Sequence, residues 1–457
     1  MHDYAIVGAG PAGIALSMQL AESGKTVVLL DEHPELGGCH RVKRLGSVRS
    51  EHGPKVYLGC YLEFFELLRK LSGRPRDELF SRIGVPGYLL EKINRDLNAG
   101  EKLWLGIAVL RGLFFGHRRG KQTVDAFASA NGFSARARDA LDAVCRIVDG
   151  GAALDTPFDS LVQQADVGGL AGMYAPRHPL DESVWSPGAE ALRKAGVHTA
   201  LGDRVTRIGQ CFVETESGES FPFCRAVLAV PPAAAAKIEG AAEELGISPR
   251  FASDTKYRRY ISATVTFDRL LPEGCVPSPF SHPWGEIMLD AGRTEGEAKS
   301  TVLMCVTRPE ARDDTGVTVN SIGCRGELAE AMRQVCEGLV GHKATGVALS
   351  PTAERRENGE WHESDASWLL TPAGFLPRKE SDWLFTCGHH TGRSGLSFNV
   401  AESAVLDALE TFRMLEPDAP AAKRRPRRSM RLSDYFRIVV LLVALVALAA
   451  AFALANK

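Results

Sequence analysis

The N-terminal stretch alternates between apolar runs and a glycine-rich turn. Residues 4–7 are apolar and lead directly into the turn Gly8-Ala9-Gly10-Pro11-Ala12-Gly13. Apolar residues at helical spacing follow, and Gly24 can end that helix. A second apolar run at 26–30 ends in Asp31. This order of strand, glycine turn, helix, strand and acid predicts a dinucleotide-binding βαβ unit.

Each glycine of the turn has a distinct physical role. Gly8 permits the tight turn, Gly10 lets a pyrophosphate approach the backbone, and Gly13 lets the helix pack against the strand. The diphosphate would lie at the positive end of the helix. Asp31 stands where a carboxylate accepts hydrogen bonds from an adenosine ribose. An acid there favours FAD or NAD over NADP.

From residue 61 the apolar spacing becomes helical. Residues 61–71 predict an amphipathic helix, and residues 75–165 are mostly helical and interrupt the nucleotide-binding pattern. Within that region, residues 103–115 are strongly apolar, include a tryptophan and precede a basic cluster at 117–121. The run is too short to span a bilayer. It predicts either a helix in a membrane interface or a buried core helix.

The second half of the chain alternates between strand and helix patterns. Residues 183–232 predict a helix, two short strands, a hairpin around Ser217-Gly218 and a buried strand that ends in Pro231-Pro232. Strands at 260–267 and 300–307, a helix at 322–342 and a strand from Ala348 predict an antiparallel sheet that floors a substrate pocket. The last motif is a strand at 383–386, a glycine-rich loop from Gly388, and a helix from about Asn399.

Composition narrows the class of protein. The chain has 457 residues and a formal net charge of -2, so no global field points to nucleic acid as a partner. Its ten cysteines show neither CxxC nor Cys/His metal spacing, so we expect no metal site. No signal peptide precedes the first strand, which predicts that the body stays in the reducing compartment where it is made.

The C-terminal stretch predicts a membrane anchor. The 18 residues after Arg437 carry no charge up to Ala455, and at about 1.5 Å each they extend roughly 27 Å. Six basic residues precede the stretch: Lys423, Arg424, Arg425, Arg427, Arg428 and Arg431. The positive-inside rule then puts the body on the cytoplasmic side. The alternative is a buried core helix at the end of the chain.

The glycine turn, Asp31-Glu32 and the pair Gly37-Gly38 together resemble a flavoprotein superfamily, that of FAD-dependent amine oxidases, protoporphyrinogen oxidases and phytoene desaturases. The resemblance implies an α/β fold: a Rossmann-type FAD-binding domain with an inserted α+β substrate domain, here with one C-terminal transmembrane helix. The implied boundaries are 1–74, 181–250 and 376–415 for the FAD-binding domain, 75–180 for a mainly helical substrate region, 251–375 for the substrate-domain sheet and helix, 416–436 for a basic linker and 437–456 for the membrane helix.

The resemblance also implies which residues bind FAD. Asp31 and Glu32 lie at the ribose, Val205 lends its backbone to the adenine, and Gly388 lies near the ribityl chain. Three further candidates belong to the last motif: His389, which replaces the family's usual acid, Phe398 and Asn399. The family's Gly-Gly-Arg is here Gly38-Cys39-His40, and Arg41 could replace the arginine by a shift of two residues.

The candidate acid/base groups lie in the turn 52–57, which in the superfamily passes beside the flavin ring. His52 could move a proton near neutral pH, and Lys55 could stabilise negative charge on the flavin. Amine oxidases of the superfamily commonly have a lysine on the facing strand, and the position aligned with it here is Ser262. The alternatives are a structural turn histidine and a solvated lysine.

These observations predict a membrane-anchored FAD-dependent oxidoreductase that dehydrogenates or desaturates a small, hydrophobic substrate by hydride transfer to flavin. One alternative is a flavin amine oxidase that releases ammonia and hydrogen peroxide. Another is a redox-neutral flavin mutase or isomerase, because the turn at 52–57 resembles a Gly-Pro-His turn of the nucleotide-sugar mutase family. The last is a membrane-tethered scaffold that no longer binds flavin.

Overall fold

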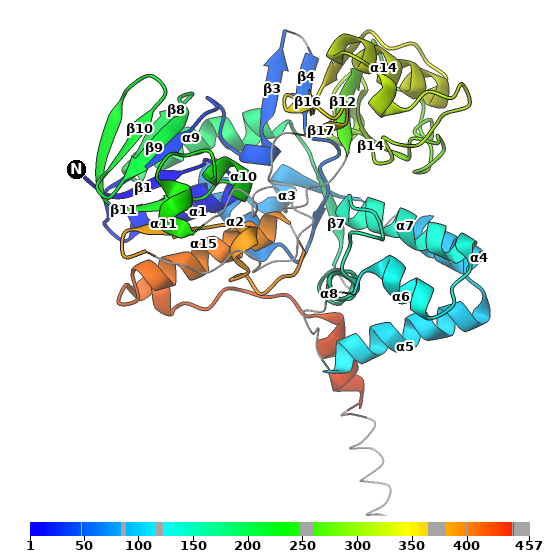
Figure 1. The fold of residues 1–457 in the computed structure, drawn as a ribbon, viewed down its shortest axis with the longest axis horizontal. Coiled ribbons are helices and arrows are strands. Elements are labelled where there is room, and N and C mark those ends of the chain that lie inside the picture. The colour runs from blue at the N-terminus through cyan, green and yellow to red at the C-terminus, as the bar shows by residue number, and fades with distance from the viewer. Residues whose placement is uncertain are drawn as a thin grey trace, which may run out of the picture.

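A seven-stranded sheet forms the centre of the first lobe in a computed structural model of the chain (Figure 1). The structure describes residues 1–46, 48–83, 88–115, 122–169, 171–246, 260–363, 381–398, 400–440 and 442. The strand order is β8-β2-β1-β11-β10-β9, and β18 also pairs with β11. The bounds are β1 (His2–Val7), β2 (Val27–Asp31), β8 (Val197–Leu201), β9 (Val205–Gly209), β10 (Phe212–Thr215), β11 (Ser220–Leu228) and β18 (Leu384–Thr386).

This sheet combines parallel strands drawn from three distant parts of the chain. β2 and β11 each pair with β1 in parallel, and β8 pairs with β2 in parallel. β18 pairs with β11 in parallel. The sequence pattern predicted separate strands at 220–223 and 225–230, but β11 is continuous. Its first half pairs with β10 and its second half with β1 and β18.

Alternate side chains of β1 enter two different cores, as strand geometry requires. Tyr4 and Ile6 pack with the helices on one face, whereas Ala5 and Val7 pack with β9, β10 and two short helices on the other. The first face carries α1 (Pro11–Glu22), α2 (Leu62–Ser72), α9 (Ser186–Lys194) and α15 (Ala401–Leu415), and the second carries α10 (Pro232–Ala235) and α11 (Ala241–Leu245). α1 packs directly on α15, which brings the two ends of the lobe together.

The second lobe is built on an antiparallel sheet in the order β13-β14-β12-β15. The strands are β12 (Ile261–Thr266), β13 (Glu286–Asp290), β14 (Thr301–Val306) and β15 (Gly346–Leu349), with α13 (Ala291–Thr294), η3 (Val319–Ser321) and α14 (Arg325–Val340) around them. Two hairpins flank the sheet: β3 (Val42–Leu45) with β4 (Val48–Glu51), and β16 (Ala353–Arg355) with β17 (Trp361–Glu363). β4 lies against β12 and β15, so the chain after the glycine turn enters the second lobe directly.

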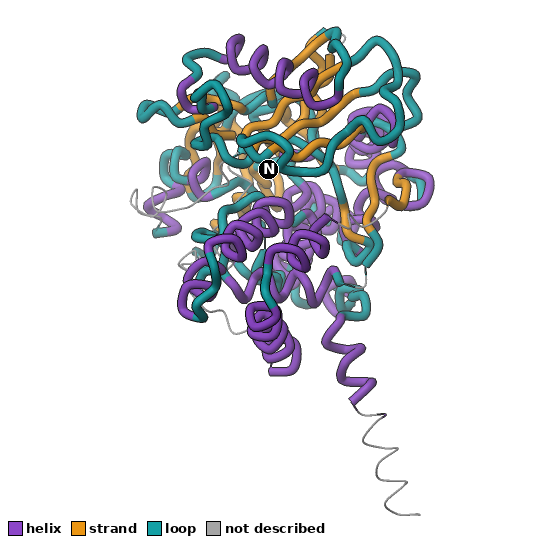
Figure 2. Tube along the Cα trace, turned by 90° about the vertical axis from the view of Figure 1, so that its right-hand side faces the viewer, coloured by secondary structure: helices purple, strands orange, loops and turns teal. Residues whose placement is uncertain are grey.

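A helical region with its own core lies beside both sheets (Figure 2). It contains α3 (Arg76–Leu79), α4 (Tyr88–Asp96), α5 (Ala99–Phe115), α6 (Val124–Ala130), α7 (Ala135–Asp149) and α8 (Phe158–Gly168). A small sheet, β5 (Tyr57–Leu58), β7 (Met173–Pro176) and β6 (Phe80–Ile83), connects it to the first lobe. The remaining short helices are η1 (Gly38–His40), η2 (Asp181–Trp185), η4 (His389–Thr391) and η5 (Pro420–Lys423).

Of the predicted membrane helix at 437–456, the structure describes only residues 437–440 and 442. Among the residues that the structure describes, no helix combines the length and the apolar character needed to cross a bilayer. The described chain does form a helix at 432–440, just before the apolar stretch.

Candidate cofactor and active site

The glycine turn is packed so tightly that two of its glycines cannot carry a side chain. Gly8 has φ +110°, and a Cβ there would lie 2.6 Å from the Ala229 carbonyl oxygen. A Cβ on Gly13 would lie 1.8 Å from the carbonyl oxygen of Gly8. The turn, the start of α1 and the end of β11 are therefore in backbone contact, as the sequence predicted for the close helix–strand packing.

The remaining glycine of the turn, Gly10, has room for a Cβ. It precedes α1 with an ordinary φ of -79°, and a Cβ there would meet only the Cα of Gly38, at 3.9 Å. Gly38 has φ +55° and approaches Gly10 from the other side. Two bare backbones thus flank the N-terminus of α1, where the first amide groups have no partner within the helix. This cradle fits a diphosphate, so the residues present fit a bound dinucleotide.

Asp31 ends β2 as predicted, and it also holds the glycine turn. Its Oδ2 accepts a hydrogen bond from the Ala9 amide (2.6 Å), and its Oδ1 accepts one from the His33 amide (2.9 Å). Burial raises the pKa of this carboxyl, while the two amides and the charge of Arg41 oppose that shift. Each oxygen of Asp31 keeps a second lone pair that a ribose hydroxyl could donate to. This ribose contact stays a prediction. Glu32 lies at the surface in an ion pair with Arg204 (3.0 Å).

The residues that replace the family's Gly-Gly-Arg divide into two environments. Arg41 is buried, and its Nε donates to the Gly38 carbonyl (3.0 Å), so its charge lies beside the cradle. His40 instead lies inside an aromatic cluster, where its Nδ1 is 2.9 Å from the Tyr57 hydroxyl and its ring lies against Phe64. Burial lowers the pKa of His40 well below its ordinary value, so this ring is neutral. Of these two residues, Arg41 is therefore the one that carries a positive charge beside the candidate cofactor site.

The loop after β18 is held by a residue that the sequence did not single out. Asp407 of α15 is fully buried, and it accepts hydrogen bonds from the Gly388 amide (2.8 Å), the Arg393 amide (3.2 Å) and the Thr391 hydroxyl. Burial raises the pKa of this carboxyl, and the hydrogen bonds counteract the rise. One side chain in the middle of α15 therefore fixes the glycine-rich loop against this helix.

The other predicted residues of this lobe lie inside it. Val205 begins β9 in the core beneath β2, and Phe398 is buried just before α15. His389 is buried within η4. Asn399 lies outside the described residues. Contacts of these residues with adenine, ribityl chain or flavin stay predictions.

His52 lies at the boundary between the two lobes and is only 1% exposed. Its Nδ1 lies 3.2 Å from both the Ser350 and the Thr352 hydroxyl oxygens. Each hydroxyl donates to Oε2 of Glu363, at 2.5 Å from Ser350 and 2.8 Å from Thr352. The other oxygen of Glu363 accepts from the Ser262 amide (3.0 Å). This His52 network joins the turn after β4 to β12, β15 and β17.

The lysine of the same turn has a clear structural role. Lys55 is buried, and its Nζ donates to the carbonyls of Cys39 (2.9 Å) and His52 (3.1 Å). It therefore ties the 52–57 turn to the chain that follows Gly38. Gly53 has φ +71°, and a Cβ there would lie 2.9 Å from the Ser262 hydroxyl. Ser262 thus packs against the turn, where the resemblance aligns it with the family's lysine.

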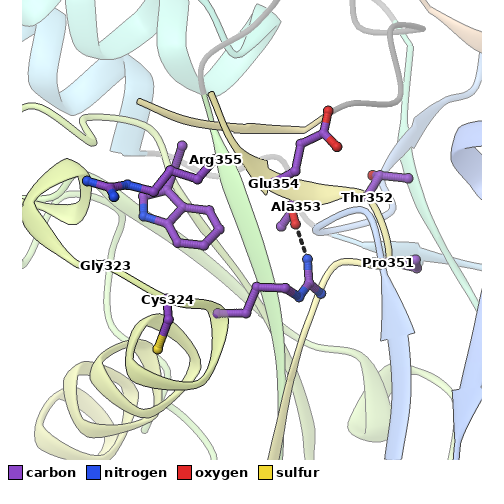
Figure 3. A pocket seen from close by; sticks show the side chains of 9 residues that line it. Gly323, Cys324, Pro351, Thr352, Ala353, Glu354 and Arg355 are labelled. Carbon is purple, nitrogen blue, oxygen red and sulfur yellow. Dashed lines mark hydrogen bonds between the residues drawn. The ribbon is translucent and has the colours of Figure 1, made fainter. Parts of the chain in front are cut away.

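An open pocket of about 620 Å³ reaches the His52 network from the surface of the second lobe (Figure 3). Thr352 lines the pocket and also contacts His52. The pocket wall includes Trp361 and two arginines, Arg325 and Arg355, and Arg325 donates to the Ala353 carbonyl. The network is therefore one side chain away from solvent on this side.

Within the candidate cofactor lobe, a buried carboxyl in the first turn of α15 connects that helix to α2. The two oxygens of Glu402 accept from the amides of Glu63 (3.1 Å) and Phe64 (2.8 Å), which cap the start of α2. Burial raises the pKa of Glu402 to about 7, and the negative charge of Glu63 adds to the shift, against the opposing effect of the two amides.

Glu402 should make stability depend on pH. Its folded-state pKa of about 7 lies above the ordinary 4.5, so the folded protein keeps a proton that the unfolded chain releases. Stability should therefore fall by about 3 kcal/mol between about pH 4.5 and about pH 7 and then level off. Urea unfolding across this range measures the fall, which Glu402→Gln should largely remove. Glu410→Gln, at a partly exposed carboxyl on the same helix, should leave it in place.

Comparison with known proteins agrees with this geometry. A family model described as an NAD(P)-binding Rossmann-like domain matches residues 6–71. A 4,4'-diapophytoene desaturase of Methylomonas is 38% identical over 69 residues, which are 15% of this chain and 14% of that protein. A zeta-carotene desaturase of Zea mays is 37% identical over 70 residues, 15% of this chain and 12% of that protein. The matched region is thus a small part of these relatives.

Solved structures resemble nearly the whole chain. A putative protoporphyrinogen oxidase from Exiguobacterium has a TM-score of 0.60 at 12% identity, and the match covers 91% of this chain and 98% of that one. A putrescine oxidase variant gives a TM-score of 0.58 at 13% identity, with 91% and 99% covered. At these identities the matches show the fold alone, a Rossmann-like α/β fold shared with these oxidases.

Proposed function

We propose that this chain, from the FAD-dependent amine oxidase and desaturase-like superfamily, is an oxidoreductase that takes a hydride from a small lipophilic molecule. The observation that carries the proposal is the cradle between Gly10 and Gly38 at the start of α1, with the His52 turn leading from it to the second lobe. The cradle fits the cofactor diphosphate, and the His52 turn places a titratable ring between the lobes. The sequence matches to carotenoid desaturases and the apolar C-terminal stretch support a lipophilic substrate.

Several residues of the chain would hold FAD. The amides at the start of α1 would bind the diphosphate, and Asp31 and Val205 would bind the adenosine. The loop fixed by Asp407 and the start of α15 would face the flavin end, where a helix N-terminus stabilises negative charge. When bound, FAD supplies the acceptor for a hydride from a substrate C–H or N–H bond.

The hydrogen bonds around His52 determine which ring nitrogen is basic. The Ser350 and Thr352 hydroxyls each use their single proton on Glu363. Toward Nδ1 of His52 both hydroxyls can therefore only accept, so Nδ1 carries the proton of the neutral ring. Nε2 is then the nitrogen that can take up a proton. In this proposal His52 moves the substrate proton through Nε2, and Glu363 is a positioning residue that acts through the two hydroxyls.

The residue that packs against the His52 turn favours dehydrogenation over amine oxidation. Ser262 occupies the position that the resemblance aligns with the lysine of amine oxidases, and among the residues that the structure describes its hydroxyl has no hydrogen-bond partner. A serine there lacks the charge and the reach of a lysine. We propose, as part of the same function, that the stretch at 437–456 anchors the body at a membrane from which the substrate is drawn.

The absorption spectrum of the purified full-length chain, before and after denaturation, tests the proposal. We expect a yellow protein that releases FAD, and bleaching of the visible flavin absorption by lipophilic substrates under anaerobic conditions. Bleaching only by amines, with ammonia and peroxide released in air, would replace the proposal with the amine oxidase alternative. Turnover that needs reduced flavin but consumes no oxidant would indicate a mutase. A colourless chain that takes up no FAD would contradict all three activities.

A further inference from the structure

α5 lies at the outer edge of the helical region (Figure 1), and it exposes an apolar face that only Arg111 interrupts. The exposed side chains share one face at helical spacing: Leu103, Trp104, Ile107, Leu110, Phe114 and Phe115. Leu103 is 64% exposed and Phe115 is 83% exposed. The opposite face packs into the helical core through Leu105 and Val109. The sequence left open an interfacial helix or a buried core helix, and the structure buries only one side of α5.

The helix at 432–440 extends this apolar face. Figure 1 shows the C-terminal segment beside the end of α5, and the rings of Phe114 and Phe436 lie 6.3 Å apart. The C-terminal helix exposes further large apolar side chains: Tyr435, Ile438, Val439 and Val440. Two segments that are more than 300 residues apart in the sequence thus form one surface. Contiguous apolar patches of this kind mark interaction sites on soluble surfaces or membranes.

Hydrogen bonds and ion pairs hold the C-terminal segment against the body. The Ser433 amide donates to Asp166 of α8 (2.7 Å), and the Arg427 amide donates to Glu63 of α2 (2.7 Å). The Arg427 guanidinium also pairs with Glu63 (3.3 Å) and Glu66 (3.4 Å). The 432–440 helix therefore has a fixed position relative to α5, so both apolar faces can meet one flat partner.

The charge around this surface favours an anionic partner. The linker just before the C-terminal helix exposes Lys423, Arg424, Arg425, Arg427 and Arg428, and beyond the helix the sequence continues without a charge to Asn456. We propose that α5 and the 432–440 helix form one membrane-docking surface, which lies in the interface of an anionic bilayer. Apolar side chains enter the headgroup boundary while the basic linker pairs with lipid phosphates.

Two features favour a bilayer over a second copy of the chain as the occupant. A symmetric contact between two copies would bring the basic linkers close together, and like charges would oppose it. The apolar stretch that follows the surface also continues beyond the length of a protein contact and matches a hydrocarbon core. Docking would orient the body so that α8, which packs on α5, lies just above the membrane.

α8 connects this surface to the candidate cofactor lobe. Gln163 of α8 donates to the Gly395 carbonyl (3.1 Å) and accepts from the Ser397 amide (2.6 Å), in the loop before α15. Only one helix therefore separates the docked surface from the loop at the flavin end. Access of a lipophilic substrate from the bilayer to this loop rests on the proposed function, whereas the docking itself does not.

Fluorescence of Trp104 tests the docking in the full-length chain, reconstituted in phosphatidylcholine–phosphatidylglycerol vesicles with brominated acyl chains. Bromine quenches only a tryptophan that enters the acyl region. Of the five other tryptophans, Trp185, Trp284 and Trp361 are buried and Trp383 is partly buried against the core of the first lobe. Trp368 lies outside the described residues and is replaced by phenylalanine in every protein tested. We therefore expect Trp104→Phe to remove most of the quenchable emission. Equal quenching in the wild type and in Trp104→Phe would overturn the proposal. Dimers in detergent with no lipid quenching would also overturn it, in favour of a second copy.

A pair of substitutions that introduces two negative charges provides the second test. Ile107→Asp combined with Leu110→Asp should reduce the Trp104 quenching at least threefold, while the tail still carries the protein to the vesicles. Leu270→Asp, at a 42% exposed residue of the second lobe, is the matched control and should leave the quenching unchanged. Flavin absorption should be the same in all three proteins, which separates failure of docking from failure of the proposed function. Unchanged quenching in the double variant would contradict the docking.

Discussion

Gly10→Ala should leave the fold intact and weaken FAD binding about 100-fold. A Cβ on Gly10 meets no protein atom closer than 3.9 Å, and its φ of -79° is ordinary for alanine. The added methyl would lie beside Gly38 at the N-terminus of α1, where in the proposed function the diphosphate approaches the backbone. Overpacking of such a contact costs about 1–3 kcal/mol, and each 1.4 kcal/mol is a factor of ten in affinity. Titration of the apoprotein with FAD, followed by flavin fluorescence, measures the loss.

Two other glycines serve as controls for this experiment. Gly13→Ala should destabilise the folded chain itself, because its Cβ would lie 1.8 Å from a backbone oxygen. Gly338→Ala, inside α14 with no atom within 4 Å of its Cβ, should bind FAD normally and gain up to about 1 kcal/mol in stability. If Gly10→Ala bound FAD as tightly as the wild type, the cradle would not be the diphosphate site.

The sequence predicted the cofactor lobe well because its signals are local. The glycine turn, α1 and β2 depend on neighbours within about 30 residues, and backbone geometry requires glycine at Gly8 and Gly13. Strand β13 was missed because two acids, Glu286 and Asp290, bracket an apolar run of only three residues. The Glu286 carboxyl is buried, and the amides of Ser281 (2.7 Å) and His282 (2.8 Å) satisfy it. The pattern of apolar residues along the chain cannot show that a nearby turn satisfies a buried acid, so this strand could not be predicted from it.

The residues that complete the candidate site could not be predicted, because their partners are distant or are backbone groups. Asp407 reads as an ordinary acid on a helix, and only the folded chain brings the Gly388 amide to it. Glu363 and Ser350 lie about 300 residues from His52 along the chain. These residues stand alone in the sequence and form no recognisable motif. The His52 network could therefore be found only in the folded structure.

Glu363→Gln should lower the rate of substrate oxidation about 100-fold while the protein stays folded. Both oxygens of Glu363 accept hydrogen bonds, one from the fixed Ser262 amide and one from two rotatable hydroxyls. A glutamine would keep its oxygen toward the amide, which cannot turn, and would direct its NH₂ group at the hydroxyls. One of the two hydroxyls, of Ser350 or Thr352, would then rotate and donate to the single lone pair of Nδ1 of His52. The neutral ring would carry its proton on Nε2 and could no longer accept one there.

The tautomer of His52 distinguishes this positioning role from a purely structural one. Nitrogen-15 chemical shifts of labelled histidine, assigned with His52→Asn, should show a protonated Nδ1 in the wild type and a protonated Nε2 in Glu363→Gln. Glu354→Gln, at an exposed acid of the neighbouring strand, should change neither the shifts nor the rate. A Glu363→Gln protein with the wild-type tautomer and a lowered rate would mean that Glu363 acts on the reaction by another route. A wild-type rate in a Glu363→Gln protein that has the exchanged tautomer would show that His52 does not transfer the proton, because Nε2 would then be unable to accept it.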